Sequence, residues 1–543
     1  MKSKTKSPSE LSCGCNCSSP SRVSRREFLK VLGAGGASTM VLSKLSAKAG
    51  LFTAEEFATL VPAAKVNMRP AYHITSPGSI GWPFDPNGAI YWKGRYHLMW
   101  IQGPGRGWAH ASSADLIHWK MHPKVDLFSY SGNAFINKQG GVTVVFGGTA
   151  RPAISVAVSL DDELNEWKLV SSKTGHEAND PDPSKYDIWD PFGWHDGENY
   201  YAIFGTYPKR SKPATVWKSS DMMKWEYIGP LLSREMPDVE AFEDISCPDM
   251  FKLGDKHMLL CIAHTKGSRY YLGQFKDCQF YPESHGRMNW PGGACFAPET
   301  LLDDKGRRIM WAWAMDDHRY RKQQTATGWA GTLTMPRVLS LASDGTVVIE
   351  PVKEYENLRS KLRKYENVPV SADSDMVLEN ISGDCLELMV EIRPSVNAPC
   401  GVKVRRSPNG QEETVISYDP VKKHLGIDVA RSSLDKSIEY HTFVQNYDGK
   451  NNTPKASENL LVTAQEAPFE LKAEEPLRLR IFLDRTILEV FANDRQCLTQ
   501  RIYPTRADSM GVSLFSTDGK AAFTSVRAWD MTAIEVLAET KEK

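Results

Sequence analysis

The segments AIYWKGRYHLMW (89–100), FINKQGGVTVVF (135–146) and MFKLGDKHMLLCI (250–262) share one pattern, in which two apolar or aromatic stretches flank a polar turn with glycine. The pattern occurs again in FGWHDGENYYAIF (192–204) and LLDDKGRRIMWAW (301–313). Each segment is typical of a β-hairpin, because aromatic and β-branched residues favour strands and glycine favours tight turns. The sequence therefore predicts five hairpins along its N-terminal half.

The spacing of these hairpins indicates a repeat. Their turn glycines are Gly94, Gly140, Gly197, Gly254 and Gly306. A second element, an apolar residue three positions before tryptophan, follows the first three hairpins at Trp119, Trp167 and Trp225. Units of roughly 40–50 residues, each one four-stranded sheet, are typical of β-propellers. We therefore expect an all-β chain whose residues 68–345 form a five-bladed β-propeller.

The pattern changes after residue 345. Lys353 to Arg363 has a charged helical pattern, which we interpret as part of a linker over 346–367. Short alternating stretches then return, as in CLELMVEIRP (385–394) and LRLRIFLDRTILEVFAN (477–493). Such stretches between polar turns favour a second all-β unit. We predict a β-sandwich over residues 368–535.

The first 49 residues are similar to a bacterial twin-arginine signal. Ser24 to Lys30 contains adjacent arginines, Val31 to Leu42 carries no charge, and Ala47-Lys48-Ala49 provides a small-x-small cleavage site. Twelve residues are too few to span a bilayer, which needs roughly 20. The resemblance implies recognition by the twin-arginine export machinery, a periplasmic or extracellular location, and no stable membrane insertion after cleavage.

Charge and cysteine content exclude other classes. Lys+Arg and Asp+Glu both number 66, so the formal net charge is zero and a strongly basic nucleic-acid-binding surface is not expected. Three of the ten cysteines precede the arginine pair, and the other seven are scattered without a Cys-x-x-Cys pair. This spacing argues against a zinc site but leaves isolated disulfides open.

Fifteen tryptophans and nineteen tyrosines suit a β-rich core or a surface that stacks on sugars.

Acidic residues lie just before hairpins one, three and four. These are Asp85, Asp190 and the stretch Glu243 to Asp249. Because the first strand of each blade lines the central channel, residues before equivalent hairpins converge at one end of it. Each Asp-Pro alone is also a common turn starter. Three converging carboxylates match the needs of glycoside hydrolysis, in which one acts as nucleophile, one as acid/base and one steadies the sugar.

The stretch WPFDPNGAIYWKGRYHLMW (82–100) resembles the Trp-x-x-Asp-Pro-Asn-Gly signature of glycoside hydrolase family 32, the invertases, levanases and inulinases. Further similar segments are WAHASSADLIHW (108–119), CPDMFKLGDKHMLL (247–260), APETLLDDKGRRIMWAWA (297–314), GWAGTLTMPRVLSL (328–341) and LRIFLDRTILEVFAND (479–494). The resemblance implies a five-bladed propeller followed by a β-sandwich. It also implies retaining hydrolysis of β-fructosyl linkages in a carbohydrate substrate, without metal or organic cofactor.

Carried over by position, Asp85 matches the family's nucleophile and Asp190 matches its transition-state stabiliser. The predicted substrate-binding residues are Asn87, Gln102, Trp108, Ser131, Trp189 and Glu299. Gln102, Trp108 and Ser131 follow from the resemblance, whereas Glu299 is included because it precedes the fifth hairpin and could point into the pocket. Trp189 replaces the usual arginine before the aspartate, and Phe84 replaces the usual asparagine before the nucleophile. Both changes affect the layer that contacts the sugar.

The largest departure is Ser246, which stands where the family's acid/base glutamate belongs. A serine cannot act as a general acid near neutral pH. Either Glu243 or Asp244 reaches the site from upstream, or the acid is lost. Period-two alternation puts Asp244 on the same face as Ser246, whereas Glu243 needs a bulge but has the longer side chain. Our order of candidates is Glu243, Asp244 and then Glu299.

These residues lead to one main prediction with alternatives. We expect an exported retaining glycosidase that cleaves β-fructosyl linkages of sucrose, levan or inulin. The changes at Phe84 and Trp189 leave another furanosyl glycoside as an alternative substrate. The serine at 246 leaves a non-catalytic carbohydrate-binding propeller open, and a fructan-building transferase is a further possibility.

Overall fold

The computed structural model describes residues 67–77, 84–102, 107–147, 153–174, 184, 186–206, 212–316, 324, 327–442, 459–517 and 520–537. The predicted export signal, and Trp82 and Pro83 of the signature, lie outside these ranges. No helix within the described ranges is long and apolar enough to cross a lipid bilayer.

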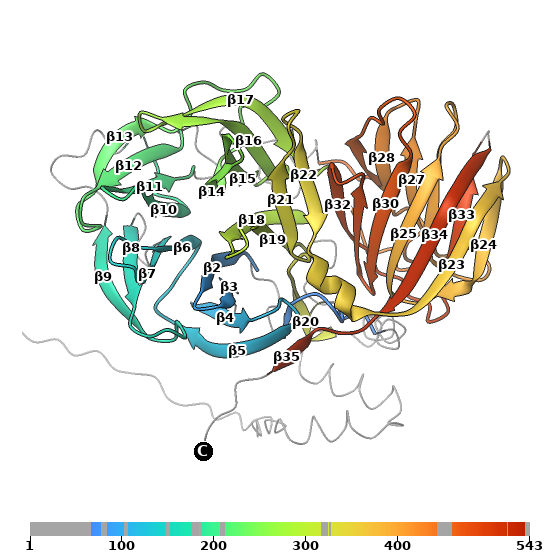
Figure 1. Ribbon diagram of the computed structural model, residues 1–543, viewed down its shortest axis with the longest axis horizontal. Helices are drawn as coiled ribbons and strands as arrows, with labels where there is room; N and C mark the ends of the chain where they lie inside the picture. Colours follow the sequence, from blue (N-terminus) through green and yellow to red (C-terminus); the bar gives the residue numbers. More distant parts are fainter. Residues whose placement is uncertain are drawn as a thin grey trace, which may run out of the picture. The chain divides into compact units, whose positions relative to one another are not determined.

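Five successive antiparallel sheets form the N-terminal part (Figure 1). The first three are β2 (Pro86–Trp92), β3 (Arg95–Ile101), β4 (Trp108–Ser113), β5 (His118–Val125); β6 (Gly132–Ile136), β7 (Val142–Gly147), β8 (Ala153–Ser159), β9 (Trp167–Thr174); β10 (Pro191–His195), β11 (Tyr200–Phe204), β12 (Thr215–Ser219), β13 (Glu226–Pro230). The last two are β14 (Ser246–Leu253), β15 (Lys256–Ala263), β16 (Gly267–Lys276), β17 (Gln279–Arg287); β18 (Cys295–Leu302), β19 (Arg308–Ala314), β21 (Arg337–Leu341), β22 (Val347–Pro351). The five predicted hairpins are thus the first two strands of five blades.

The innermost strands close into a ring. β2, β6, β10, β14 and β18 each contact the innermost strand of the next blade, and β18 returns to β2. Blade one gains a fifth strand, because β35 (Glu535–Leu537) pairs in parallel with β5. A separate pair joins β1 (Thr75–Pro77) to β20 (Trp329–Thr332). The predicted five-bladed propeller is confirmed.

The recurring tryptophans fix the turn between the third and fourth strands of a blade. The indole N–H of Trp119 donates to the carbonyl of Leu116 at 3.0 Å. The corresponding bond in blade two joins Trp167 to Leu164 at 2.9 Å. Leu116 and Leu164 have φ of 67° and 58°, so the turn uses left-handed backbone that the indole helps to hold.

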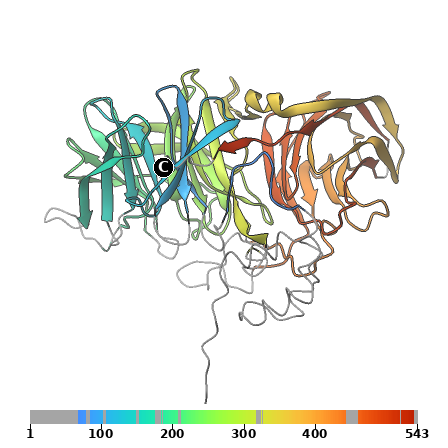
Figure 2. The ribbon, with the colours of Figure 1, turned by 90° about the horizontal axis from the view of Figure 1, so that it is seen from below.

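Two six-stranded sheets form the C-terminal part (Figures 1 and 2). One contains β23 (Arg359–Val370), β34 (Ala521–Met531), β25 (Cys385–Arg393), β30 (Leu477–Asp484), β31 (Ile487–Ala492) and β32 (Gln496–Arg501). The other contains β24 (Ser374–Ser382), β33 (Gly511–Ser516), β26 (Cys400–Arg406), β27 (Thr414–Asp419), β28 (His424–Asp428) and β29 (Ala464–Pro468). Apolar residues of both sheets form one shared core, which confirms the predicted sandwich.

The predicted helical linker is only partly helical. Lys353–Leu358 forms a 3-10 helix, whereas the residues from Arg359 onward belong to β23. Exposed residues alternate with less exposed ones over 363–366 and again over 367–370 of β23, and β23 pairs with β34. Pairing with a neighbouring strand therefore overrides the local helical pattern of the charged residues.

Buried acids connect the sandwich to the propeller. The Asp484 carboxylate accepts hydrogen bonds from the backbone N–H groups of Ala71 and Tyr72, both at 2.7 Å. Glu489 of β31 forms a buried ion pair with Arg337 of β21. Both acids lie in the 479–494 segment that resembles the family, which gives that segment a structural role.

The seven cysteines from Cys247 onward are free thiols.

Candidate active site

The first residues of the innermost strands meet at one end of the channel. Oγ of Ser131, before β6, lies 3.9 Å from Sγ of Cys247 in β14. The backbone N–H of Cys247 donates to Oδ2 of Asp190, 3.2 Å away and directly before β10. Oδ1 of Asn87, in β2, accepts from the backbone N–H of Gly132 at 2.9 Å. Residues far apart in sequence thus converge at the channel mouth.

Three of these strands share a backbone kink. Asp190, Cys247 and Ala297 have φ of 41°, 45° and 44°, and each is followed by proline. Left-handed backbone at a residue other than glycine costs of order 1–3 kcal/mol and persists where the surroundings enforce it. Its recurrence in blades three, four and five shows that the kink is a repeated feature of the channel mouth.

Asp85 and Asp190 are two buried acids at the channel mouth. Each is 8% exposed. Burial raises the pKa of Asp85 to about 7, with a further contribution from the charge of Asp190, whereas His264 opposes the rise. Because charges shift each other's pKa mainly over short distances, the two carboxyl groups share one environment. Oδ1 of Asp85 accepts no hydrogen bond from the described residues, so its lone pairs remain for attack on carbon.

Two of the predicted substrate-binding residues stabilise the loops of the mouth. Besides holding Gly132, Asn87 donates from Nδ2 to the carbonyl of Asp85 at 2.8 Å. Trp108 is fully buried, and its indole N–H donates to the carbonyl of Tyr130 at 2.7 Å. This hydrogen bond holds the backbone that leads to Ser131. Sugar contact by Trp108 stays a prediction.

Three other predicted binding residues, Gln102, Ser131 and Trp189, border the mouth, and Glu299 is described below. Gln102 directly follows β3, and its backbone N–H donates to the carbonyl of Gly107 at 3.4 Å. Ser131 is adjacent to Cys247, as described above. Trp189 is half-buried, and its carbonyl accepts from the backbone N–H of Gly205 at 2.7 Å. Sugar contacts by these three residues stay a prediction.

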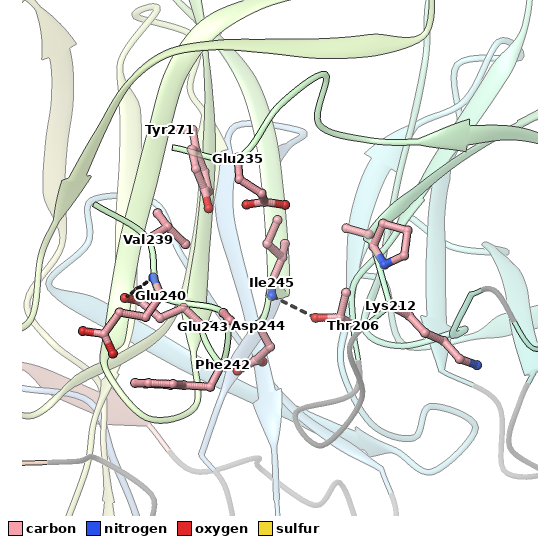
Figure 3. Close-up of a pocket in the computed structure, with 13 residues that line it drawn as sticks. Thr206, Lys212, Glu235, Val239, Glu240, Phe242, Glu243, Asp244, Ile245 and Tyr271 are labelled. Atoms are coloured by element: carbon pink, nitrogen blue, oxygen red, sulfur yellow. Dashed lines mark hydrogen bonds between the residues drawn. The ribbon is translucent and has the colours of Figure 1, made fainter. Parts of the chain in front are cut away.

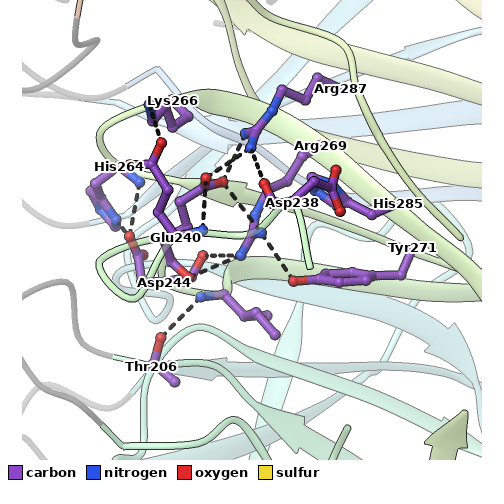
Figure 4. A network of polar contacts seen from close by, with 12 residues as sticks. Thr206, Asp238, Glu240, Asp244, His264, Lys266, Arg269, Tyr271, His285 and Arg287 are labelled. Atoms are coloured by element: carbon purple, nitrogen blue, oxygen red, sulfur yellow. Dashed lines mark hydrogen bonds and ion pairs between the residues drawn. The ribbon is translucent and has the colours of Figure 1, made fainter. Parts of the chain in front are cut away.

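Glu243, the first candidate acid, is held by arginines. Its carboxylate accepts two hydrogen bonds from Arg287, both 2.7 Å long, and lies 3.5 Å from Arg269. Burial opposes ionisation of Glu243, but Arg287 and Arg269 outweigh it and lower its pKa. Figure 4 shows these arginines converging on one network. An ionised, bidentate carboxylate is poorly suited to donate a proton.

Asp244, the second candidate, is bound to a histidine. Its Oδ2 is 2.7 Å from Nδ1 of His264, and its Oδ1 accepts the backbone N–H of His264 at 2.9 Å (Figure 4). Ser246 donates its hydroxyl to the same Oδ2 at 2.7 Å. Burial opposes ionisation of Asp244, but His264 and these hydrogen bonds lower its pKa. Asp244 is therefore the partner of a cation.

Glu299, the third candidate, lies deeper in the channel. Its Oε1 accepts the backbone N–H of Ala89, in β2, at 3.3 Å. Burial, followed by the charge of Asp249, raises the pKa of Glu299 well above its usual value. Both acids and Arg308 line a cavity of about 460 Å³ whose lining does not include Asp85. Glu299 thus belongs to the channel interior.

A second cavity, of about 370 Å³, adjoins the mouth (Figure 3). Thr206 and Lys212 line one side, and Phe242, Glu243 and Asp244 line the other. Its volume is within the range of small-ligand sites, and the carboxylates of Glu243 and Asp244 form part of its wall. The cavity offers space next to Asp244 for part of a carbohydrate.

Three buried histidines in blade one could be taken for a metal site. Ligand atoms of His97, His110 and His122 lie within 4.8 Å of one another. His97 Nδ1 is 2.9 Å from His110 Nε2, while His122 bonds to Asn165 through Nδ1 and to Ser112 through Nε2. Since both nitrogens of His122 already form hydrogen bonds, we interpret the cluster as a polar network within the blade.

His264 is a residue of this region that the sequence analysis did not consider. It follows β15, and the register pairs Ser246 with Ile262. Continuing this antiparallel register by two residues sets His264 opposite Asp244, so the hairpin itself contained the signal. A single histidine after an apolar strand does not by itself indicate a function. Its pairing with Asp244 becomes visible only when the register of the hairpin is known.

Comparison with known proteins supports this architecture. Residues 73–351 match the glycosyl hydrolases family 32 N-terminal domain, and residues 354–530 match the family 32 C-terminal domain. Sucrose-6-phosphate hydrolase from Zymomonas mobilis is 27% identical over 516 residues, covering 85% of this chain and 92% of the relative. Levanase from Bacillus subtilis is 27% identical and covers 83% of this chain and 68% of the levanase.

Solved structures share the fold. Fructan 1-exohydrolase IIa from Cichorium intybus has a TM-score of 0.72 at 19% identity, covering 87% of this chain and 99% of that chain. Exo-inulinase from Aspergillus awamori has a TM-score of 0.68 at 20% identity, covering 86% and 99%. The two matched domains correspond to the propeller and the sandwich. The protein is therefore a glycosidase, and the chain belongs to glycosyl hydrolases family 32.

Proposed function

We propose that this glycosidase hydrolyses β-fructosyl linkages of the sucrose, levan or inulin type with retention of configuration. The observation that carries the proposal is the buried pair of Asp85 and Asp190 at the channel mouth. The names of the relatives, sucrose-6-phosphate hydrolase and levanase, support a fructose-containing substrate.

In this mechanism Asp85 attacks the anomeric carbon of the fructosyl unit, and the bond to the leaving alcohol breaks. A covalent ester between the sugar and Asp85 forms, and water then hydrolyses it. Asp190, fixed by the backbone N–H of Cys247, accepts hydrogen bonds from sugar hydroxyls near the cationic centre. Burial strengthens these electrostatic interactions because little water screens them.

The test uses purified protein with sucrose, levan, inulin and matching arabinosides. We expect fructose or fructo-oligosaccharides as products, and NMR of the first-formed anomer should show retention. Release of arabinose alone supports the alternative furanosyl substrate. Binding without any turnover supports a carbohydrate-binding propeller, the alternative favoured by the buried Ser246.

We also propose export by the twin-arginine route, based on the arginine pair and the cleavage site within residues 1–49. The double variant Arg25→Lys, Arg26→Lys should accumulate in the cytoplasm with an uncleaved N-terminus. Unchanged export of this variant, measured by cell fractionation, would contradict the proposal.

A further inference from the structure

Retaining hydrolysis requires a proton donor, and the family position for it holds Ser246. The Ser246 side chain is fully buried, and its hydroxyl donates to Asp244 Oδ2 at 2.7 Å, while the Thr206 carbonyl oxygen also lies 3.0 Å from the hydroxyl oxygen. The carboxylate of Glu243 forms an ion pair with Arg287, and Glu299 lines the cavity of about 460 Å³ in the channel interior. None of these residues is arranged to protonate a leaving group beside Asp85.

We propose that His264, positioned by Asp244, is the general acid and base of this enzyme. The inference rests on the proposed function and identifies the proton donor of the same site. It assigns catalysis to a histidine–aspartate pair in place of a glutamate.

The backbone places His264 at the channel mouth. It follows β15, the partner of β14, and the N-terminal end of β14 contacts Asp190 through Cys247. The imidazole also packs edge-on against Phe296 of β18, with ring centroids 5.8 Å apart. His264 therefore lies between Asp244, which precedes β14, and the start of β18, at the same end of β14 where Cys247 contacts Asp190.

Asp244 fixes both the backbone and the ring of His264. One carboxylate oxygen accepts the backbone N–H at 2.9 Å, and the other lies 2.7 Å from Nδ1. With Nδ1 bonded to Asp244, Nε2 is the nitrogen that carries the transferable proton. The His264 side chain is 11% exposed, so the ring is nearly enclosed but keeps some accessible surface.

The charges around His264 favour its protonated form. Burial alone disfavours the imidazolium, but Asp244, then Asp190 and Asp85, raise the pKa of His264. The same proximity acts on Asp85, where His264 opposes the rise in pKa. The acids that raise the pKa of His264 come from three blades.

The proton balance is complete without another reactant. In the first step Asp85 forms its bond to the anomeric carbon, while the imidazolium Nε2–H transfers its proton to the departing alcohol oxygen. In the second step neutral Nε2 takes a proton from water, whose oxygen attacks the anomeric carbon. The ester bond to Asp85 breaks, and imidazolium and carboxylate are both restored.

The experiment compares wild type with His264→Gln and Asp244→Asn, and uses His285→Gln as a matched control. His285 is also in blade four and is also bonded through Nδ1 to an aspartate, Asp238, at 2.7 Å. Substrates are sucrose and 4-nitrophenyl β-fructofuranoside, whose leaving group needs little protonation. Azide is added to the aryl assays because it attacks the fructosyl ester without base catalysis.

We expect His264→Gln to lower kcat/KM for sucrose by roughly 10²–10⁴-fold. The loss on the aryl fructoside with azide should be about tenfold or less. Asp244→Asn removes the charge that raises the pKa of His264. His264 should then lose its proton at a lower pH, so the alkaline limb of the pH profile of kcat/KM should move to lower pH. His285→Gln should retain the wild-type pH profile.

A folded His264→Gln protein with sucrose activity within about threefold of wild type and the same alkaline limb overturns the assignment. If that variant does not fold, an alkaline limb unchanged by Asp244→Asn overturns it. A wild-type protein inactive on both substrates and on the fructan panel contradicts the proposed function itself.

Discussion

Blade one should make the protein sensitive to acid, through the buried histidines 97, 110 and 122. Burial lowers the pKa of His97 to about 3 and lowers the pKa of the other two histidines. In the unfolded chain each histidine titrates near 6.5. Below that pH the histidines of the unfolded chain bind protons, whereas the buried histidines of the folded protein stay neutral. The free energy of unfolding therefore falls as the pH decreases.

The magnitude follows from these values. At pH 5.5 an unfolded histidine gains about RT ln 11, roughly 1.4 kcal/mol, over its neutral folded form, whereas at pH 7.5 the gain is close to zero. For His97, whose folded pKa of about 3 keeps it neutral at both pH values, this difference should cost about 1.4 kcal/mol, and His110 and His122 add to the loss in the same direction. Replacing the central residue, His110→Gln, should remove the contribution of His110 to this loss, while lowering stability at pH 7.5 through the altered network.

Urea unfolding at pH 7.5 and 5.5 measures the difference for each protein. His118→Gln provides the control, because His118 is an exposed histidine of the same blade whose pKa is raised by Asp115. Its removal should not reduce the acid sensitivity. The reasoning is refuted if His110→Gln loses as much stability on acidification as wild type.

Three further predictions concern the channel mouth. Asp85→Asn should lower kcat by several orders of magnitude with an unchanged circular dichroism spectrum, since the covalent step is lost; near-normal turnover would exclude Asp85 as nucleophile. Trp189→Arg should change the ratio of kcat/KM values for sucrose and inulin, because a planar cation with several donors replaces a flat apolar face; equal, high values on sucrose for both proteins would contradict this. Glu243→Gln should lower the denaturation temperature, because it leaves Arg287 and Arg269 with a neutral partner, yet keep the pH profile; a lost alkaline limb would make Glu243 the acid instead.

The fold could be predicted because its signals are local and repeated. Each hairpin carries its own glycine turn, as at Gly94 and Gly254, and each Trp motif fixes a turn within one blade. The exception was Lys353 to Arg363, where half of a helical pattern became strand β23. There the pairing with β34, more than 150 residues away, outweighs local propensity.

The sequence by itself determined that acids precede the inner strands of blades one and three, because chain position relative to a hairpin sets which end of the channel a residue occupies. It could not determine which side chains touch there. Glu243 forms ion pairs with two arginines, one from β16 and one from β17. Asp244 pairs with His264, which follows β15. Whether a carboxyl group near the channel mouth is free to donate a proton depends on the cations that packing brings beside it. That choice is electrostatic and non-local, so only the tertiary structure decided it.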